Sequence, residues 1–499
     1  MTGRVDHERA PLLETLIQYA DGGIYPFHTP GHKGGRFAAP ELTALVGSRG
    51  LALDLPAMTA TDNTFHPTGC VREAQLLASD LFGAAETFFL SAGSTLGVAT
   101  ALLAAAPPGA TVALPRNIHR SVVAGLVLSG ARPRFMPHEV LSECGALGVG
   151  REQLVEALET PPRPAAVLLT RPSYYGLARD LTDIVAICRE RRVTLIVDEA
   201  HGAHLHFLPP GGPQPALAAG ADLVVQSCHK TLGSLVGSAQ LHVGHRSPVD
   251  ATRVRDALNF LQTTSPSYLL MASLDATRRW LWREGRELFA RAVEEARQLE
   301  ETIDAMPGLR VLRPEKDARL AGHLRDPLRL VVNTSGTGWT GYEVERHLRS
   351  EFLVEDEMSD WFNVVYLLSP HDDEVARSRL LAGLRSVSQA PRRASNESEA
   401  ATGCLLQPPI PPLAMLPRDA ALAPKRSISL SGAAGHTCAE MVMFYPPGIP
   451  LLMPGELITE ETLDVCRQLL AAGAHPYASD TTFATLRVVE SVGAAEATD

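Results

Sequence analysis

Short apolar runs alternate with amphipathic segments between residues 86 and 226. Five runs have strand length and are built mostly of Val, Ile, Leu, Ala and Phe: residues 86–90, 111–114, 165–169, 193–197 and 221–226. The intervening segments 96–106, 122–128 and 181–191 have the length and composition of helices. Strands that alternate with helices predict an α/β domain with a mainly parallel, doubly wound sheet and right-handed crossovers.

The pattern changes after residue 263. Long helices are predicted at about 269–282 and 286–306, and a small α+β unit follows, with strands at 328–334 and 363–369 and a helix at 342–351. The first residues include a short amphipathic helix around Leu12 and Leu16. The predicted organisation is an N-terminal arm (1–50), a large domain (51–285), a small α+β domain (286–388), a linker (389–425) and a C-terminal α+β domain (426–499).

Polar residues follow three of the predicted strands. Asp198 comes directly after the run 193–197, Lys230 follows the run 221–226, and His119 follows the run 111–114. Positions 198 and 230 are 32 apart, which suffices for one crossover and return, so both side chains are expected on neighbouring strands facing one crevice.

Lysine is scarce in this chain, which narrows the search for a reactive amine. There are four, Lys33, Lys230, Lys316 and Lys425, and Lys230 is the one that follows a predicted buried strand. A partly desolvated amine at that place is suited to Schiff-base chemistry. The alternative is a lysine whose stem lies along the strand end while its charge reaches solvent.

Small hydroxyl residues stand at the start of the predicted helix 96–106. Backbone N–H groups and the helix dipole favour a phosphate there, and Ser94 and Thr95 add hydroxyl donors. Both residue types are also ordinary helix N-caps, so this feature alone leaves the choice open.

These features together predict a site for pyridoxal phosphate (PLP). Lys230 is expected to hold the cofactor through a Schiff base, and Asp198 to keep the pyridine nitrogen protonated so that the ring can withdraw electrons. His119 is expected to stack on one face of the ring, and the methyl group of Ala200, two residues past Asp198, to pack on the other.

Composition and charge narrow the classes of partner. The chain has 499 residues, 45% hydrophobic content and a net charge of −11 without basic clusters, which argues against nucleic-acid or anionic-membrane partners and leaves a basic or zwitterionic small molecule compatible. Neither a run of about 20 apolar residues nor a signal-peptide core is present, so a cytoplasmic location is expected. Seven scattered cysteines without a C-x-x-C pair indicate reduced thiols and no metal site.

Several motifs closely resemble the bacterial ornithine/lysine/arginine decarboxylase family, and the resemblance covers nearly the whole chain. The motifs are residues 26–33, 93–95, 116–119, 198–201, 227–232, 445–450 and 454–456. The resemblance implies a PLP enzyme of fold type I in its short form, without an N-terminal wing domain. It also implies a homodimer or higher oligomer with active sites at the subunit interface.

The same resemblance assigns further site residues. Ser94, Thr95, Ser227 and His229 look like phosphate ligands, and His201 belongs to the motif that follows Asp198. Thr264 and Ser265 look like the contribution of one subunit to its partner's site.

The predicted activity is PLP-dependent decarboxylation of a basic amino acid, arginine before lysine or ornithine, to an amine or polyamine precursor. A cationic substrate side chain needs a carboxylate, for which Glu456 is the first candidate and Glu440 the second; alternatively, Glu456 caps a helix that starts near Thr459. The segment 435–440 has fewer hydroxyl groups than the family pattern, which bears on substrate preference. Competing functions are an aminotransferase or carbon–sulfur lyase of the same fold and a catalytically silent regulatory homologue, and the presence of Lys230 disfavours the last.

Overall fold

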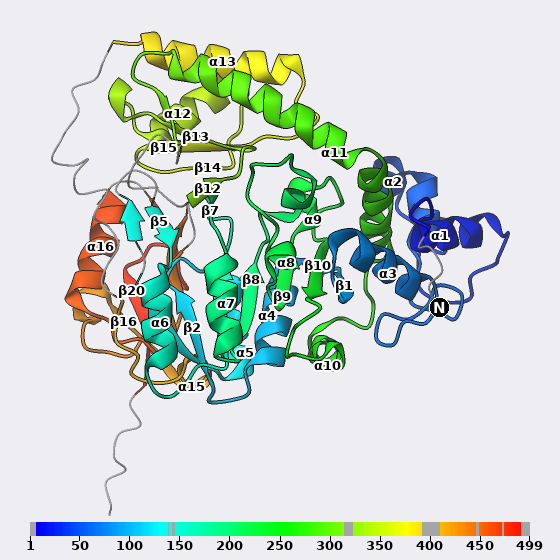
Figure 1. The fold of residues 1–499 in the computed structure, drawn as a ribbon, viewed down its shortest axis with the longest axis horizontal. Helices are drawn as coiled ribbons and strands as arrows, with labels where there is room; N and C mark the ends of the chain where they lie inside the picture. The colour runs from blue at the N-terminus through cyan, green and yellow to red at the C-terminus, as the bar shows by residue number, and fades with distance from the viewer. Residues whose placement is uncertain are drawn as a thin grey trace, which may run out of the picture. The chain divides into compact units, whose positions relative to one another are not determined.

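A computed structural model describes residues 6–137, 139–141, 145–313, 323–391, 410–445, 449–471 and 474–490. The structure divides into two units. Figure 1 shows the helices and strands of the chain, coloured by residue number. The first unit combines Met1–Ala105 with Asp180–Arg291, and the second combines Ala106–Arg179 with Ala292–Asp499. Each unit is described by itself below.

Four strands of the first unit lie side by side in the order β1 (Glu86–Leu90), β10 (Ala239–Val243), β9 (Leu223–Gln226) and β8 (Thr194–Asp198). Strands β8 and β9 are parallel, whereas β10 runs antiparallel to both β9 and β1. All their residues are buried, which the apolar runs of β1, β8 and β9 indicate and the polar-interrupted sequence of β10 does not. The sequence pattern located β1, β8 and β9 but not β10.

The helices of the first unit are α1 (Pro11–Asp21), α2 (Pro40–Leu53), α3 (Cys70–Phe82), α4 (Gly93–Ala105), α7 (Thr182–Glu190), α8 (Ala216–Ala219), α9 (Cys228–Thr231) and α10 (Ala251–Leu261), with a 3-10 helix at Ala203–Phe207. Among them, α1, α4 and α7 follow predicted ones within a few residues, whereas α2, α8, α9 and α10 were not predicted. In α4, a Cβ atom at Gly97 would lie 2.7 Å from Val225 Cγ1 and 2.8 Å from Leu90 Cδ1. Glycine therefore lets α4 pack closely against β9 and β1.

Helix α11 (Tyr268–Asp304) is one continuous helix of 37 residues, so the prediction of two helices with a break before residue 286 was wrong. Gly285 stands at the expected break. A Cβ atom there would lie 2.8 Å from Phe207 Cδ1, which means that the glycine makes room for an aromatic ring instead of ending the helix.

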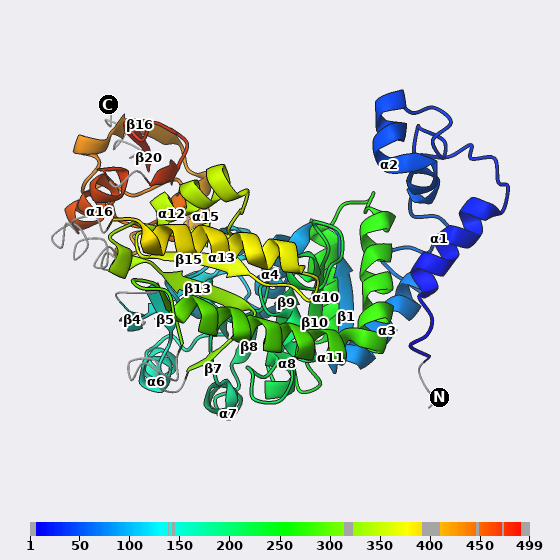
Figure 2. The same cartoon turned by 90° about the horizontal axis from the view of Figure 1, so that it is seen from above.

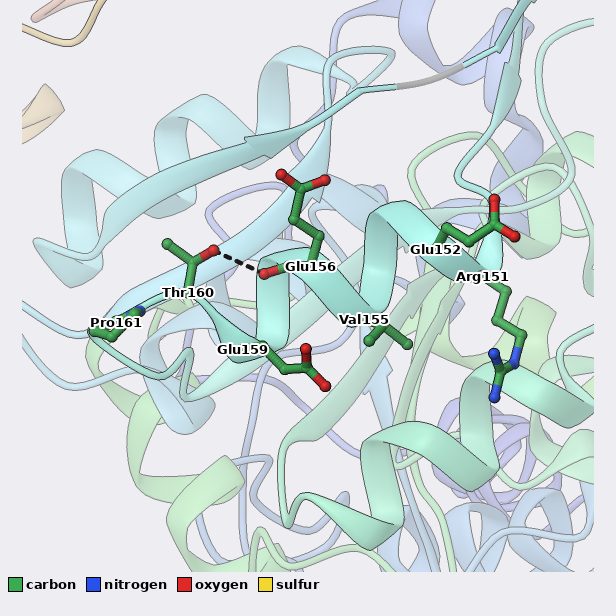
Figure 3. A pocket seen from close by; sticks show the side chains of 7 residues that line it. All are labelled: Arg151, Glu152, Val155, Glu156, Glu159, Thr160 and Pro161. Atoms are coloured by element: carbon green, nitrogen blue, oxygen red, sulfur yellow. Dashed lines mark hydrogen bonds between the residues drawn. The ribbon is translucent and has the colours of Figure 1, made fainter.

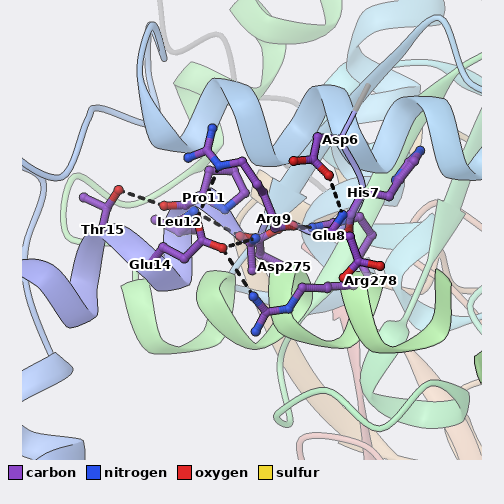
Figure 4. A network of polar contacts seen from close by, with 12 residues as sticks. Asp6, His7, Glu8, Arg9, Pro11, Leu12, Glu14, Thr15, Asp275 and Arg278 are labelled. Carbon is purple, nitrogen blue, oxygen red and sulfur yellow. Dashed lines mark hydrogen bonds and ion pairs between the residues drawn. The ribbon is translucent and has the colours of Figure 1, made fainter. Parts of the chain in front are cut away.

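A buried ion pair on α11 anchors the beginning of the N-terminal arm, as Figure 4 shows. Asp275 accepts a hydrogen bond from Leu12 N at 2.9 Å and pairs with Arg278, whose Nη2 lies 3.1 Å from Asp275 Oδ1. Arg278 also donates to the carbonyls of His7 and Arg9. Asp275 thereby accepts an N–H group of the first turn of α1, which has no acceptor within the helix, and Arg278 binds two carbonyl groups that precede the helix. Figure 2 shows α1 and α2 at the same end of the first unit as α3.

In the second unit, β2 (Thr111–Pro115) is parallel to both β3 (Arg132–Met136) and β6 (Ala166–Thr170). Together with the β8–β9 pair, these strands confirm the mainly parallel α/β arrangement. Smaller elements of this part of the unit are β4 (Glu139–Leu141), β5 (Gly145–Gly148), β7 (Leu177–Arg179), β12 (His323–Arg325), α5 (Arg120–Ser129) and α6 (Arg151–Glu159).

The region predicted as the small domain contains a four-stranded antiparallel sheet. Its order is β11 (Arg310–Val311), β13 (Arg329–Asn333), β15 (Asn363–Leu367) and β14 (Met358–Ser359). Helices α12 (Gly341–His347) and α13 (Glu374–Gln389) pack on it around a core that includes Leu330, Val364 and Leu384. A capping box of Thr340 and Glu343 starts α12, and a π-helical turn at Leu348–Phe352 ends it.

The C-terminal part begins earlier than the predicted boundary at residue 426. Residues 392–409 of the predicted linker lie outside the described residues, but 410–425 are structured: α15 (Pro417–Leu422) starts with a proline in its first turn, and Arg418 Nε donates to Val127 O at 2.8 Å. The proline content of this stretch led to the prediction of a linker. Proline is also common in the first turn of a helix, however, and that is its place in α15. The remaining elements are β16 (Lys425–Ser429), β17 (Val442–Tyr445), β18 (Pro450–Leu452), α16 (Glu460–Ala471), β19 (His475–Tyr477) and β20 (Thr485–Val489), with short 3-10 turns at Ser335–Thr337 and Leu430–Gly432.

Some sequence expectations fall outside the described residues, among them Lys316, Cys144, Cys404 and the turn at 446–448. The cysteines Cys70, Cys188, Cys228, Cys438 and Cys466 are free thiols. A search of the described helices finds none with the length and hydropathy required to cross a membrane.

Candidate active site

Asp198 and Lys230 stand at the carboxyl ends of two neighbouring parallel strands. Asp198 is the last residue of β8, whose partner across the β8–β9 pair is Val225. Strand β9 ends at Gln226, and Lys230 lies in the one-turn helix α9 that follows it. The prediction that both residues belong to adjacent strand ends is therefore met by the topology, and this is the edge at which α/β proteins bind ligands.

The Lys230 amine is half-buried and has an imidazole beside it. Its Nζ atom lies 2.9 Å from His201 Nε2, in the turn that follows β8. The ammonium group can only donate, so this contact requires the lone pair of a neutral His201. The contact holds the flexible lysine stem in one direction, which prepares the amine for a bond to a ligand.

Asp198 is buried and 3% exposed. Burial raises the pKa of its carboxyl group, and the positive charge of Lys230 opposes that rise. Its Oδ1 atom accepts a hydrogen bond from Ala200 N at 3.2 Å. A carboxylate in such a place is stabilised by a protonated nitrogen of a ligand, because a buried charge needs a partner.

Ala200 lies in the turn that the Asp198 carboxylate stabilises. Since β8 ends at Asp198, the alternation of side chains along a strand does not extend to residue 200. The strand alternation from which the packing of its methyl group on a ring was predicted is therefore absent at this position, and the packing stays a prediction.

Two buried hydroxyl groups next to Lys230 have no hydrogen-bond partner among the described residues. They are Ser227 Oγ and Thr231 Oγ1, at the start and the end of α9. Unsatisfied buried polar atoms are uncommon, and a ligand with acceptor oxygens would satisfy both. His229, also in α9, has its ring fixed by a 2.8 Å hydrogen bond from Nδ1 to Ser238 O.

The start of α4 has the form of an anion site. Gly93 has a φ of +70°, and its N–H donates to Gly237 O at 2.7 Å. Ser94 and Thr95 occupy the first turn, whose N–H groups have no acceptor within the helix. The backbone turn at Gly93 and the two hydroxyl residues fit a phosphate group.

The remaining cofactor candidates lie on loops. Thr264 and Ser265 are exposed after α10 and are accessible to another chain. His119 is the N-cap of α5: its Nδ1 accepts the N–H of Ser121 at 3.2 Å. The stacking role predicted for His119 stays a prediction.

The two predicted substrate carboxylates already have partners. Glu456 is fully buried and forms a bidentate ion pair with Arg116, at 2.5 Å (Oε1–Nη1) and 2.9 Å (Oε2–Nη2). Its Oε2 also accepts the N–H of Met453 at 2.9 Å. Arg116 follows β2, so this pair fastens the C-terminal part to the end of that strand. The geometry favours a structural role over the predicted substrate contact.

The alternative that Glu456 caps α16 was wrong, because Thr459 Oγ1 accepts the N–H of Thr462 at 3.2 Å and serves as the cap. Glu440 accepts two backbone N–H groups, from Arg487 at 2.6 Å and from Ser479 at 2.7 Å. These bonds order the C-terminal part and occupy both carboxylate oxygens.

Two family models match this sequence. The model described as Orn/Lys/Arg decarboxylase, major domain, matches residues 10–376, and the model of the C-terminal domain matches residues 404–475. The chain belongs to the Orn/Lys/Arg decarboxylase family. It is therefore an amino-acid decarboxylase, and the family prediction from the motifs is confirmed.

Individual comparisons show which proteins this decarboxylase is similar to. An arginine decarboxylase of Halalkalibacterium halodurans is 37% identical to it over 97% of this chain and 98% of that one. The structure of the constitutive lysine decarboxylase of E. coli superposes with a TM-score of 0.84 at 20% identity, over 97% of this chain and 82% of that one. A structure of SPT with PLP has a TM-score of 0.50 at 20% identity, over 64% of this chain and 76% of that one. The two structures show that the decarboxylase has the fold of fold-type I PLP enzymes.

A hollow of about 570 Å³ lies beside α6 of the decarboxylase. Figure 3 shows the glutamates Glu152, Glu156 and Glu159 along it, with Thr160 donating a hydrogen bond to Glu156 O at 2.8 Å. None of the residues that line it is one of the predicted cofactor or substrate ligands. The hollow has no part in the function proposed below.

Sequence reasoning did not assign roles to several buried polar residues of the decarboxylase. Arg116 was quoted as part of a motif, but its partner Glu456 is 340 residues away. Gln226 and His242, both within buried strands, were not singled out at all. A polar residue inside an otherwise apolar strand was the signal that could have identified Gln226.

Proposed function

We propose that this decarboxylase acts on arginine, ahead of lysine or ornithine, and uses PLP. The observation that carries the proposal is the placement of Lys230 and the buried Asp198 at the ends of adjacent parallel strands. The 37% identical arginine decarboxylase supports arginine as the first substrate to test.

The residues of the first unit fit the cofactor. Lys230 would hold it through a covalent bond to Nζ, and Asp198 would accept a hydrogen bond from the ring nitrogen and keep it protonated. Ser227, whose hydroxyl lacks a partner among the described residues, and the first turn of α4 would bind the phosphate. PLP, when bound, supplies an electron-withdrawing ring that stabilises the electron pair left on the α-carbon after CO2 departs.

The substrate proposal is tested with purified protein, added PLP and four amino acids: arginine, lysine, ornithine and citrulline. Citrulline is a neutral near-isostere of arginine, with a urea group in place of the guanidinium. We expect CO2 release from arginine with a kcat/KM at least about tenfold above lysine and ornithine and about two orders of magnitude above citrulline, because a site built for a cation leaves its polar groups unpaired with citrulline.

Equal turnover of citrulline and arginine would contradict a basic substrate. Transfer of the amino group to a 2-oxo acid without CO2 release would contradict the decarboxylation of these substrates.

We also propose that the chain works as a homodimer or a higher homo-oligomer. Large apolar side chains of the first unit are exposed, including Phe27 (98%), Phe37 (82%), Val236 (82%) and Phe260 (84%). An arm that exposes two phenylalanine rings is suited to pack against a second chain, which would remove both rings from water. The arm that carries Phe27 and Phe37 follows α1, which the Asp275–Arg278 pair holds in place.

A shared site predicts complementation between inactive subunits. Lys230→Ala protein and Thr264→Ala/Ser265→Ala protein should each be inactive, and mixing them under conditions of subunit exchange should restore up to about a quarter of the wild-type activity, since hybrid dimers contain one intact site. Exchange is verified by recovering both chains through an affinity tag on one. Continued inactivity of verified hybrids would contradict the shared site.

A further inference from the structure

Four polar side chains form a continuous hydrogen-bonded chain through the interior of the first unit. Thr87 Oγ1 lies 2.9 Å from His242 Nδ1, His242 Nε2 lies 3.1 Å from Gln226 Oε1, and Gln226 Nε2 lies 2.7 Å from Glu199 Oε2. Each of the four residues is at most 1% exposed. The chain crosses β1, β10 and β9 and ends at the residue after β8 (Figure 1).

The chain has a defined direction. The amide nitrogen of Gln226 faces Glu199 and donates to it, so its oxygen must accept from His242 Nε2–H, and His242 Nδ1 must accept from the Thr87 hydroxyl. Burial lowers the pKa of His242 to about 3, with a further contribution from His206, so the ring is neutral as this pattern requires. Every donor points towards the Glu199 carboxylate, whose other oxygen accepts the N–H of Ala216 at 2.9 Å.

The hydrogen bond between Glu199 and Gln226 ties together the carboxyl ends of β8 and β9, next to which Asp198 and Lys230 lie. Glu199 directly follows Asp198, and Gln226 directly precedes Ser227 and the turn that holds Lys230. Asp198 is paired with Val225 across the parallel strands, so Gln226, the next residue, points to the opposite face of the sheet. The hydrogen bond between Glu199 and Gln226 therefore lies on the opposite face of the sheet from Asp198 and leaves the face of Asp198 open to a ligand.

Apolar packing protects this chain from water. The Phe82 ring lies 5.3 Å from the His242 ring and 5.2 Å from the His206 ring, centroid to centroid. In such surroundings a hydrogen bond has no competing solvent partner, and the loss of one member leaves its neighbours unsatisfied. The chain is consequently a rigid connection between strand ends.

We propose that Glu199, Gln226 and His242 are positioning residues that fix Asp198 and Lys230 relative to each other for cofactor binding. This inference rests on the proposed use of PLP. Cofactor sites depend on side-chain placement to within about 0.5 Å, and residues that touch neither cofactor nor substrate supply that placement.

The test measures PLP affinity and the visible absorption of the bound cofactor in Gln226→Leu protein. Leucine keeps the volume but removes both amide hydrogen bonds. We expect the Kd for PLP to rise by about tenfold to a hundredfold, the absorption band of bound PLP to shift or broaden, and kcat to fall while KM changes by less than about threefold.

The double variant Glu199→Gln/Gln226→Glu provides the rescue. The carboxylate now at position 226 can accept from both His242 and the new amide, and that amide can accept the Ala216 N–H, so every hydrogen bond is preserved with the charge moved by one strand. We expect the double variant to bind PLP at least about tenfold more tightly than Glu199→Gln protein does. Thr87→Val removes the hydrogen bond at the far end of the chain and should weaken PLP binding by only about twofold to fivefold. If Gln226→Leu protein does not fold, Thr87→Val and the double variant test the proposal in its place.

Asn333→Leu is the matched control. Asn333 is a buried amide that donates from β13 to Asn363 Oδ1 in β15 at 3.1 Å, so its loss should lower thermal stability without changing the spectrum or the Kd of PLP. Folded Gln226→Leu protein with wild-type Kd and spectrum would overturn the proposal, as would a double variant no better than Glu199→Gln alone. Wild-type protein that binds no PLP would instead overturn the proposed function.

Discussion

Replacement of Lys230 by alanine is expected to lower kcat for decarboxylation by at least about three orders of magnitude and to abolish covalent retention of PLP. The amine lies beside His201, one turn past the end of β9, and of the other lysines that the structure describes, neither Lys33 nor Lys425 follows a strand of the first unit. Without it the cofactor can bind only through its phosphate and ring contacts. The measurements are CO2 release and the mass of the protein after borohydride reduction.

Lys425→Ala is the matched control, because Lys425 is exposed on β16 in the C-terminal part. It should keep wild-type kcat and wild-type covalent labelling. A Lys230→Ala protein that still forms a reducible covalent adduct with PLP would show that another amine carries the cofactor.

Replacement of Asp198 by asparagine is expected to lower kcat by about two to three orders of magnitude while the protein still binds PLP. The asparagine side chain keeps the shape and can still accept from Ala200 N, but it carries no charge to stabilise a protonated ring nitrogen. The effect should therefore fall on kcat far more than on KM. Steady-state kinetics together with the absorption spectrum of the bound cofactor separate these contributions.

Asp222→Asn is the control for this variant. Asp222 is also a buried aspartate with a pKa raised by burial, but it precedes β9 and accepts from Leu195 N at 2.8 Å, at the opposite end of the same two strands. It should change kcat by less than about threefold. Near-normal kcat in Asp198→Asn protein with bound PLP would remove Asp198 from its proposed role.

The sequence pattern was sufficient for strands that contain at least three consecutive apolar residues, such as β1 and β8. The run 86–90 became β1 with the same bounds, and the run 193–197 became β8, which ends with Asp198. Strand β10 was missed because Gln240 and His242 interrupt its apolar pattern, and their burial depends on partners in β1 and β9 that the local sequence does not show. Pairing between polar residues in separate strands is a tertiary property.

The candidate site divides in the same way. Lys230 and Asp198 could be predicted because each follows a recognisable buried strand, and parallel topology brings such ends together. Glu456 could not be interpreted from its local sequence, since its ion pair with Arg116 forms between residues 340 positions apart. From its position in a tight turn, Glu456 could equally contact a substrate, cap a helix or form a structural ion pair. The ion pair could be recognised only once the fold placed Arg116 beside it.

The most direct test of the account is to identify the lysine that binds PLP. Wild-type protein is incubated with PLP, reduced with borohydride, digested and mapped by mass spectrometry. The account predicts a phosphopyridoxyl group on the peptide that contains Lys230 and unmodified Lys33, Lys316 and Lys425 at stoichiometric labelling. Labelling of one of those three lysines in place of Lys230, or no covalent label at all, would contradict it.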